Sequence, residues 1–377
     1  MRDVERWSSR RRLLATMRGE AADRVPVVIR GVNPYARHMN WRGEAHPSYA
    51  PMVELVRTRC DVEHLLSIGG GFCLNGAEMA SEKQVREHHG WRESHTRIET
   101  PLGPLEAITR EGIDSYSHAT IEHWITSEGD VDRFLSLPYE PAEPPGEAFR
   151  AAEETVGDRG YTLPYLDGPV GWVHGLLGSE LVAIWSVEAP ERLHRLLEVM
   201  QERCLAYIRS FLSTSQAAIL GLQGQESVTP PLLSPARFDE LVVRYEEPLF
   251  QEVHRHGALA YVHCHGYLNA VLGRFADMGV DVLHPIEAPP MGDVTLAEAK
   301  RRVGARICLA GNIQIGDVMA LERHEIVEAV QQALCDGKPG GRFILTLTAT
   351  PFERVLSPRT LENLEALVDT ALELGAW

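Results

Sequence analysis

The feature that most limits the fold of this chain is a regular alternation of short apolar runs with longer amphipathic segments. The runs have the length and β-branched character of buried strands, and they occupy residues 23–30, 61–68, 161–167, 217–223, 259–263, 280–287, 306–312 and 342–349. Strands that alternate with helices build a parallel sheet. About eight such units predict an α/β fold, a (β/α)8 (TIM) barrel, which we expect to form a single domain over residues 1–377.

One stretch departs from this alternation. Between about residues 82 and 124 polar and apolar side chains alternate, as in His95–Gly103 and Pro104–Arg110, with a turn at Pro101–Pro104 between them. Tyr116–Trp124 is a candidate third strand of the same kind. We therefore expect an antiparallel β excursion added to the barrel. A doubly wound open sheet is the alternative fold, but no G-x-G-x-x-G motif follows a predicted strand.

Composition excludes several classes of partner. The net charge of −16 argues against a nucleic-acid backbone as a partner. No uninterrupted apolar run reaches the roughly 18 residues of a membrane helix, and no apolar signal segment follows the basic N-terminus. The six cysteines are scattered without a CxxC pair, which is typical of reduced thiols. These observations predict a cytoplasmic protein that binds neither nucleic acid nor membrane.

The most chemically distinctive stretch is Ala258–Gly266, an apolar run that ends in three consecutive potential metal ligands. If Leu259–His263 is a strand, His263 and His265 point to one face and Cys264 points to the other. Two imidazoles at the end of a buried strand are a suitable start for a zinc site. Two hydrogen-bonded histidines at the rim of the core are the alternative interpretation.

Other polar residues follow neighbouring strands, and in a barrel the carboxyl ends of all strands face one pocket. Glu226 follows the strand before His263, so we expect it to be the third zinc ligand, with a surface carboxylate as the alternative. These three residues form the predicted catalytic set. Cys264 or Glu287 could replace Glu226 as a ligand, and Glu287 could instead accept an imidazole N–H.

The same strand ends supply candidate contacts for a substrate. The candidates that we expect to line the pocket are Arg30, Asn33, Tyr35, Arg37, Tyr165 and Trp172. A solvated loop is the alternative for the first four, and ordinary core packing is the alternative for the two aromatic residues. His284, in contrast, is typical of a hydrogen-bonded core histidine.

Several of these stretches together resemble a known family. They are Ser234-Pro235, Tyr261-Val-His-Cys-His-Gly266, Gly279-Val-Asp-Val-Leu-His-Pro-Ile-Glu287, Leu309-Ala-Gly-Asn312 and Gly340-Gly-Arg-Phe-Ile-Leu. In this order they are similar to the uroporphyrinogen decarboxylase superfamily over most of the chain. The resemblance implies a (β/α)8 barrel, in agreement with the count of strands.

Within that superfamily the chain is similar to the corrinoid-dependent methyltransferase and O-demethylase branch. The residues that carry this likeness are Thr96–Gly103 and the following Ile121-Glu-His-Trp-Ile-Thr. The arginine-rich segment of the decarboxylase itself is represented here by Arg30 alone. Members of the branch bear His-x-Cys-Gly and a later Cys as zinc ligands. Here His263 matches the family His, His265 stands in place of the Cys, and the later Cys is replaced near Ala349.

The resemblance implies a zinc-dependent methyltransferase. A methyl group would pass from a small, methoxylated donor to the cobalamin of a separate corrinoid protein, and a site of imidazole and carboxylate would favour an oxygen substrate over a thiol. The alternative is a metal-free decarboxylase of a polycarboxylate, and a ligand-binding barrel without catalysis is a third reading. A homodimer is compatible with the sequence.

Overall fold

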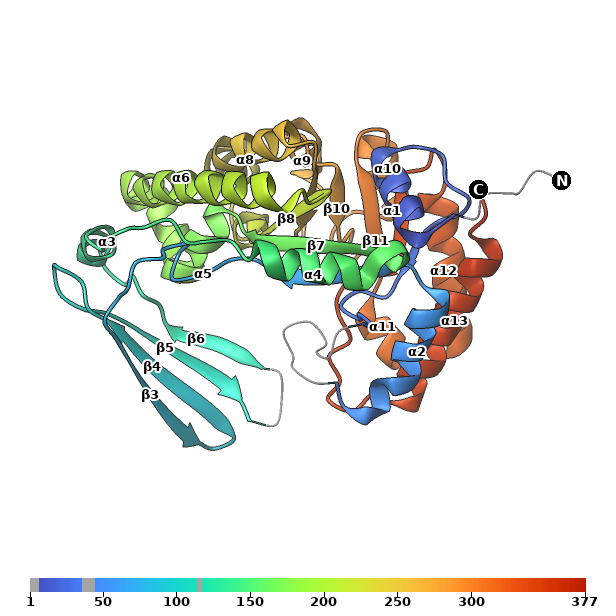
Figure 1. Ribbon diagram of the computed structural model, residues 1–377, viewed down its shortest axis with the longest axis horizontal. Helices are drawn as coiled ribbons and strands as arrows, with labels where there is room; N and C mark the ends of the chain where they lie inside the picture. Colours follow the sequence, from blue (N-terminus) through green and yellow to red (C-terminus); the bar gives the residue numbers. More distant parts are fainter. Residues whose placement is uncertain (1–6, 36–44, 114–116) are drawn as a thin grey trace.

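The computed structural model describes residues 7–35, 45–113 and 117–377, and its centre is a sheet of eight parallel strands. The strands are β1 (Val27–Val28), β2 (Val62–Ser67), β7 (Gly160–Asp167), β8 (Ile219–Gln223), β9 (Leu259–His263), β10 (Val282–His284), β11 (Cys308–Ile313) and β12 (Phe343–Leu347). The strands are hydrogen-bonded to one another in the order β1-β12-β11-β10-β9-β8-β7-β2, and helices surround them (Figure 1). The predicted (β/α)8 barrel is confirmed.

The sheet closes between its first two strands through a side chain. The backbone N–H of Asp61 donates to the Val27 carbonyl at 2.8 Å, and the carboxylate of Asp61 accepts from the Val27 N–H at 2.9 Å. Strand β1 covers only two residues of the predicted 23–30 run. Asp61 is fully buried and also accepts from Arg12 and Arg24, so its charge is compensated.

The helices are α1 (Ser9–Arg18), α2 (Ala50–Arg59), α3 (Glu128–Leu135), α4 (Gly146–Val156), α5 (Pro169–Glu188), α6 (Pro190–Ser215), α7 (Pro235–Phe238), α8 (Arg244–Arg255), α9 (Leu272–Asp277), α10 (Leu296–Val303), α11 (Ile315–Ala320), α12 (Arg323–Gly337) and α13 (Pro358–Leu374). By length and composition alone, α5 could cross a membrane. Val173, Leu176 and Leu177 of this helix are nonetheless buried in the same core cluster as Leu193 of α6, which is how a core helix packs.

Two apolar layers follow from the alternation of side chains along each strand. Tyr161, Leu163, Ile219 and Tyr261 form an inner cluster together with Leu13 and Met17 of α1, so α1 closes one end of the barrel. The neighbouring residues of the same strands belong to the larger cluster beneath the outer helices. Ser8 caps α1 by accepting from the Arg11 N–H.

The predicted antiparallel excursion is also present. Strands β3 (Ser81–His88), β4 (Trp91–Ile98), β5 (Leu105–Gly112) and β6 (His118–Glu122) form a separate sheet in this order. This sheet extends away from the barrel, and all of β3 is exposed (Figure 1). Tyr116, the predicted start of the third strand, lies outside the described residues. The excursion therefore adds a second sheet without entering the barrel.

Candidate functional site

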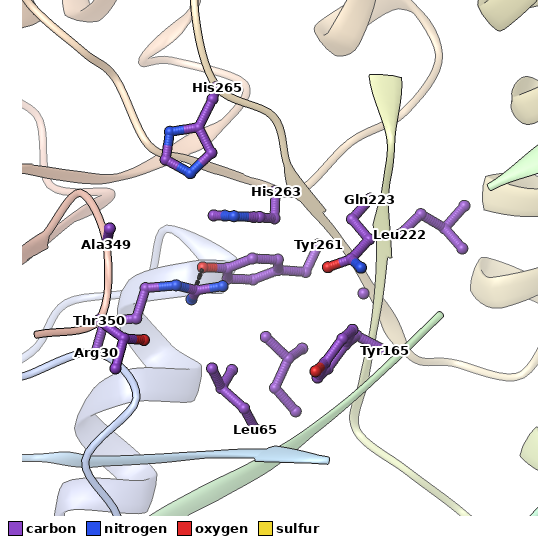
Figure 2. Close-up of a pocket in the computed structure, with 12 residues that line it drawn as sticks. Arg30, Leu65, Tyr165, Leu222, Gln223, Tyr261, His263, His265, Ala349 and Thr350 are labelled. Carbon is purple, nitrogen blue, oxygen red and sulfur yellow. Dashed lines mark hydrogen bonds between the residues drawn. The ribbon is translucent and has the colours of Figure 1, made fainter. Parts of the chain in front are cut away.

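A cavity of about 230 Å³ opens among the carboxyl ends of the barrel strands. Aliphatic and aromatic side chains share its wall with imidazole, amide and guanidinium groups, which face it from several sides (Figure 2). The lining residues are Arg30, Leu65, Leu163, Tyr165, Gly221, Leu222, Gln223, Tyr261, His263, His265, Ala349 and Thr350. The cavity is smaller than pockets for drug-sized ligands, which suits a substrate with a single ring.

His263 and His265 both face this cavity, as the strand alternation predicts. Their rings meet edge to face, with the centroids 4.7 Å apart and an interplanar angle of 86° (Figure 2). Cys264 between them is fully buried in the outer core cluster. Burial raises the pKa of the Cys264 thiol well above its usual value, so the thiol stays protonated. The structure therefore does not bring Cys264 together with the two imidazoles.

The Nδ1 atom of His263 is engaged behind the cavity. It lies 2.8 Å from Nδ1 of His284, and Nε2 of His284 lies 2.9 Å from the Leu347 carbonyl oxygen. His284 is the hydrogen-bonded core histidine that the sequence predicts, because its side chain is fully buried. Burial, followed by the positive charge of Arg30, keeps the pKa of His263 well below its usual value, so the ring is neutral.

The Nδ1 atom of His265 is engaged by Glu287. One carboxylate oxygen of Glu287 lies 3.2 Å from this nitrogen and also accepts from the Gly266 N–H at 2.9 Å. Burial opposes ionisation of Glu287, but the hydrogen bonds from His265 and Gly266 prevail and lower its pKa. Of the two roles weighed for Glu287, the contacts match the acceptor of an imidazole N–H.

Glu226 lies in the 3₁₀-helix η4 (Gln225–Val228), directly after β8. Its Oε2 atom is buried and has no hydrogen-bond partner among the described residues. Burial raises the pKa of its carboxyl group, while the charge of His265 acts in the opposite direction. A buried carboxylate oxygen without a partner is rare and requires an explanation, and an ion is one. This residue is the one that the sequence analysis expects as the third zinc ligand.

The side chains near the cavity are of the types that bind zinc, but they are not close enough together to form a complete site. Because both Nδ1 atoms are engaged, the Nε2 atoms are the ring nitrogens left for a metal. Neutral imidazole nitrogen and carboxylate oxygen are the usual ligands of catalytic zinc. Within the described part of the chain, however, no three side chains of His, Cys, Asp or Glu lie close enough to hold an ion as they stand. Two histidines thus fit a zinc ion, and a third ligand has to move toward them.

Arg30 faces the cavity and is already paired inside the barrel. Its Nη1 atom donates to Glu63 at 2.8 Å. The same atom donates to the Tyr261 hydroxyl at 3.0 Å (Figure 2). Tyr161 donates to the second oxygen of Glu63 at 2.6 Å. The charge of Arg30 is therefore compensated by Glu63, and its hydrogen bonds to Glu63 and Tyr261 both use Nη1.

The remaining predicted contacts are divided. Tyr165 lines the cavity, as expected. Asn33 is buried and lies 2.6 Å from His64, and its side-chain oxygen accepts from the Tyr35 N–H. Asn33, Tyr35 and Trp172 are not among the residues that line the cavity. Arg37 falls outside the described residues.

Sequence reasoning missed several lining residues. Tyr261 precedes His263 by two positions and Leu163 precedes Tyr165 by two, so each shares a strand face with a residue that was identified. The period of two was a sufficient signal for both. Glu63 could not be found in this way, because its role depends on its contact with Arg30, 33 positions away.

Comparisons with known proteins agree with this architecture. The uroporphyrinogen decarboxylase (URO-D) family matches residues 117–374. A uroporphyrinogen decarboxylase of Trichodesmium erythraeum (strain IMS101) is 25% identical over 381 residues, which cover 97% of this chain and 96% of that protein. A methyltransferase from Methanosarcina mazei has a similar structure, with a TM-score of 0.62 at 18% identity, covering 98% of this chain and 99% of the other. Because the family match extends over more than half of its length, the chain belongs to the uroporphyrinogen decarboxylase family.

Proposed function

We propose that this protein is a zinc-dependent methyltransferase that moves a methyl group from a small methoxylated substrate to the corrinoid of a partner protein. The observation that carries the proposal is the pair of cavity-facing imidazoles, His263 and His265, each with its Nδ1 atom engaged by another residue. The fold shared with the Methanosarcina mazei methyltransferase supports the reaction class.

The residues of the cavity have separate tasks in this proposal. His263 and His265 hold the metal through Nε2, and Glu226 completes the set by moving toward them. Zinc bound there would supply a Lewis acid for the ether oxygen of the substrate. Tyr165, Leu163 and the other apolar lining residues pack against the ring of the substrate and exclude water from the oxygen that is released.

The electron balance of the transfer is that of a direct displacement. The electron pair of the new bond to carbon would come from a reduced Co(I) corrinoid on the partner protein, and the C–O pair of the substrate would stay on oxygen. A developing phenolate needs a nearby positive charge. Arg30 alone is poorly suited to this task, because Glu63 already compensates it.

The charges around the cavity favour a cation and a neutral substrate. Three acidic side chains lie next to residues that line the cavity: Glu287 and Glu226 interact with His265, and Asp167 accepts from Gln223. Burial raises the pKa of both Asp167 and Glu226. Carboxylates that are costly to ionise in isolation are stabilised by a bound cation. A substrate with several carboxylates would meet these groups and a single, compensated arginine. We therefore expect a neutral methoxylated aromatic compound as the donor.

The first test is metal content. We expect about one zinc per chain by plasma mass spectrometry in protein purified with zinc present, and loss of zinc in both His263→Ala and Glu226→Ala. Loss of zinc in His263→Ala alone would support the zinc site but show that a residue other than Glu226 is the third ligand. Absence of metal from the unmodified protein would refute the zinc mechanism. Methyl loss from methoxylated aromatic compounds, with a reduced corrinoid protein as acceptor, then tests the reaction.

A metal-free decarboxylase of a polycarboxylate is the second candidate, and the uroporphyrinogen decarboxylase of Trichodesmium erythraeum favours it. In that case Arg30 would hold a carboxylate through the Nε and Nη2 atoms left out of its pair with Glu63. The two functions differ in one experiment. Release of CO₂ from a polycarboxylate in the presence of a chelator supports the decarboxylase, and methyl transfer that a chelator abolishes supports the methyltransferase.

A further inference from the structure

A chain of two hydrogen bonds runs from the backbone of β12 through His284 to His263. Residues His284 and His263 are direct partners in the parallel pair β10–β9, which places their side chains next to each other. The Leu347 carbonyl, His284 and His263 are joined at 2.9 Å and 2.8 Å. His284 does not line the cavity, so it cannot touch a substrate there.

The directions of these hydrogen bonds follow from the carbonyl group of Leu347, at which the series of hydrogen bonds ends. A carbonyl oxygen only accepts, so Nε2 of His284 carries the proton that it shares with Leu347. His284 is fully buried, and neither of its hydrogen-bond partners, the Leu347 carbonyl and the His263 ring, has a negative charge that would stabilise an imidazolium. Its ring is therefore neutral and carries one proton, so Nδ1 of His284 is left as an acceptor. Nδ1 of His263 must then be the donor. The proton of neutral His263 is thereby placed on Nδ1, and Nε2 keeps its lone pair.

The packing also fixes the plane of the His263 ring. The rings of His263 and His284 stack at 4.9 Å between centroids and 20° between planes, and Tyr261 stacks on His284 at 6.3 Å and 26°. His284 is 0% exposed, so its ring is enclosed by other side chains and held in one orientation. A leucine could fill the same space but could neither donate to Leu347 nor accept from His263.

We infer that His284 is a positioning residue, which holds His263 as the Nδ1–H tautomer and so presents the Nε2 lone pair to the cavity. The role differs from that of Glu287, which binds His265 with a full negative charge. His284 supports His263 without placing a negative charge behind its ring. This inference rests on the proposed function only for what binds at Nε2. The tautomer itself belongs to the metal-free protein.

The test compares His284→Gln, whose amide can both accept and donate, with His284→Phe, which keeps ring volume alone. His194→Phe serves as a control, because His194 is also hydrogen-bonded on both nitrogens, to Tyr245 and Glu240, outside the cavity. Two-bond ¹H–¹⁵N spectra of the metal-free proteins report the tautomer of His263, which is assigned by its loss in His263→Ala. Competition with a chelating dye measures the affinity for Zn²⁺.

We expect the Nδ1–H tautomer of His263 in the unmodified protein, the same tautomer in His284→Gln and His194→Phe, and a mixed or Nε2–H form in His284→Phe. Zn²⁺ affinity should fall about 10- to 100-fold in His284→Phe, the usual cost of losing an outer-shell partner, and be largely retained in His284→Gln. An Nε2–H tautomer in the unmodified protein overturns the inference, even if His284→Phe does not fold. Failure of every protein to bind zinc would refute the proposed function and leave the tautomer result standing.

Discussion

Arg30 and Glu63 form an ion pair of 2.8 Å inside the barrel, with the side chains 8% and 6% exposed. The pair joins the segment after β1 to strand β2, and Arg30 also lines the cavity. A buried pair loses its hydration when the chain folds, so its net contribution to stability is small while both partners remain. Removal of one partner leaves a buried charge without compensation, which is far more costly.

Replacement of Glu63 by glutamine should therefore destabilise the protein strongly. The amide would still accept from Tyr161 but would leave Arg30 without a negative partner, and the expected loss is about 3–5 kcal/mol of unfolding free energy in denaturant titrations. Glu54→Gln is the matched control, because Glu54 pairs with Arg57 on the surface and both side chains are at least half exposed. The control should change stability by less than about 1 kcal/mol. Equal effects of the two substitutions would contradict the argument.

The barrel was predictable because its pattern is local. Each strand is a short apolar run, and long helices such as α6, α8 and α13 have a clear apolar stripe. Helix α5 (Pro169–Glu188) lacks such a stripe, because it is apolar on most sides, and the sequence did not predict it. The two-residue strand β1 is shorter than its apolar run, since apolarity specifies burial and not ladder pairing.

The site was predictable only as far as one strand reaches. The period of two placed His263 and His265 on one face, and the structure confirms that their rings are adjacent. The contact of His263 with His284 depends on the register of β9 against β10, which no local pattern contains. The roles of Glu226 as a ligand and of zinc and cobalamin as cofactors stay predictions.

Glu287→Gln should weaken metal binding through His265. The substitution keeps an oxygen that can accept from His265 or from the Gly266 N–H, but it removes the negative charge beside the His265 ring. We expect Zn²⁺ affinity to fall by about tenfold, as for other outer-shell partners, with the thermal midpoint little changed. Glu353→Gln is a control for loss of a carboxylate, because Glu353 accepts from Thr360 away from the cavity. Unchanged affinity in Glu287→Gln would remove Glu287 from the support of the site.

Glu246 should make stability depend on pH. It is fully buried beside Gly168, accepts from Gln225 at 2.7 Å, and burial raises its pKa to about 8. The unfolded chain ionises Glu246 near its ordinary value, so between that value and about pH 8 the unfolded state gains up to about 1.4 kcal/mol per pH unit over the folded state. Below the ordinary value both states are protonated, and above pH 8 both are ionised.

Glu246→Gln should abolish this dependence. The stability of the variant relative to the unmodified protein should rise steadily from pH 5 to pH 8 and then level off, as measured by chemical unfolding at several pH values. Glu247→Gln, at the next position of α8, should show no such trend, because Glu247 is partly exposed. A constant difference between Glu246→Gln and the unmodified protein over this pH range would show that Glu246 ionises normally in the fold.

Ala349 marks the place where the family resemblance expects a cysteine ligand, and the structure places this residue in the cavity lining with His263 and His265. Ala349→Cys should therefore supply a third ligand without movement of Glu226. We expect the affinity for Zn²⁺ to rise at least about tenfold, because a direct ligand should contribute no less than an outer-shell partner does. We also expect a thiolate charge-transfer band in the Co²⁺-substituted protein. Ala349→Ser, of similar size and without a soft donor, should change neither property. If Ala349→Cys binds zinc no better than Ala349→Ser, the two imidazoles do not direct their Nε2 atoms at a common point, and the metal site proposed here is wrong.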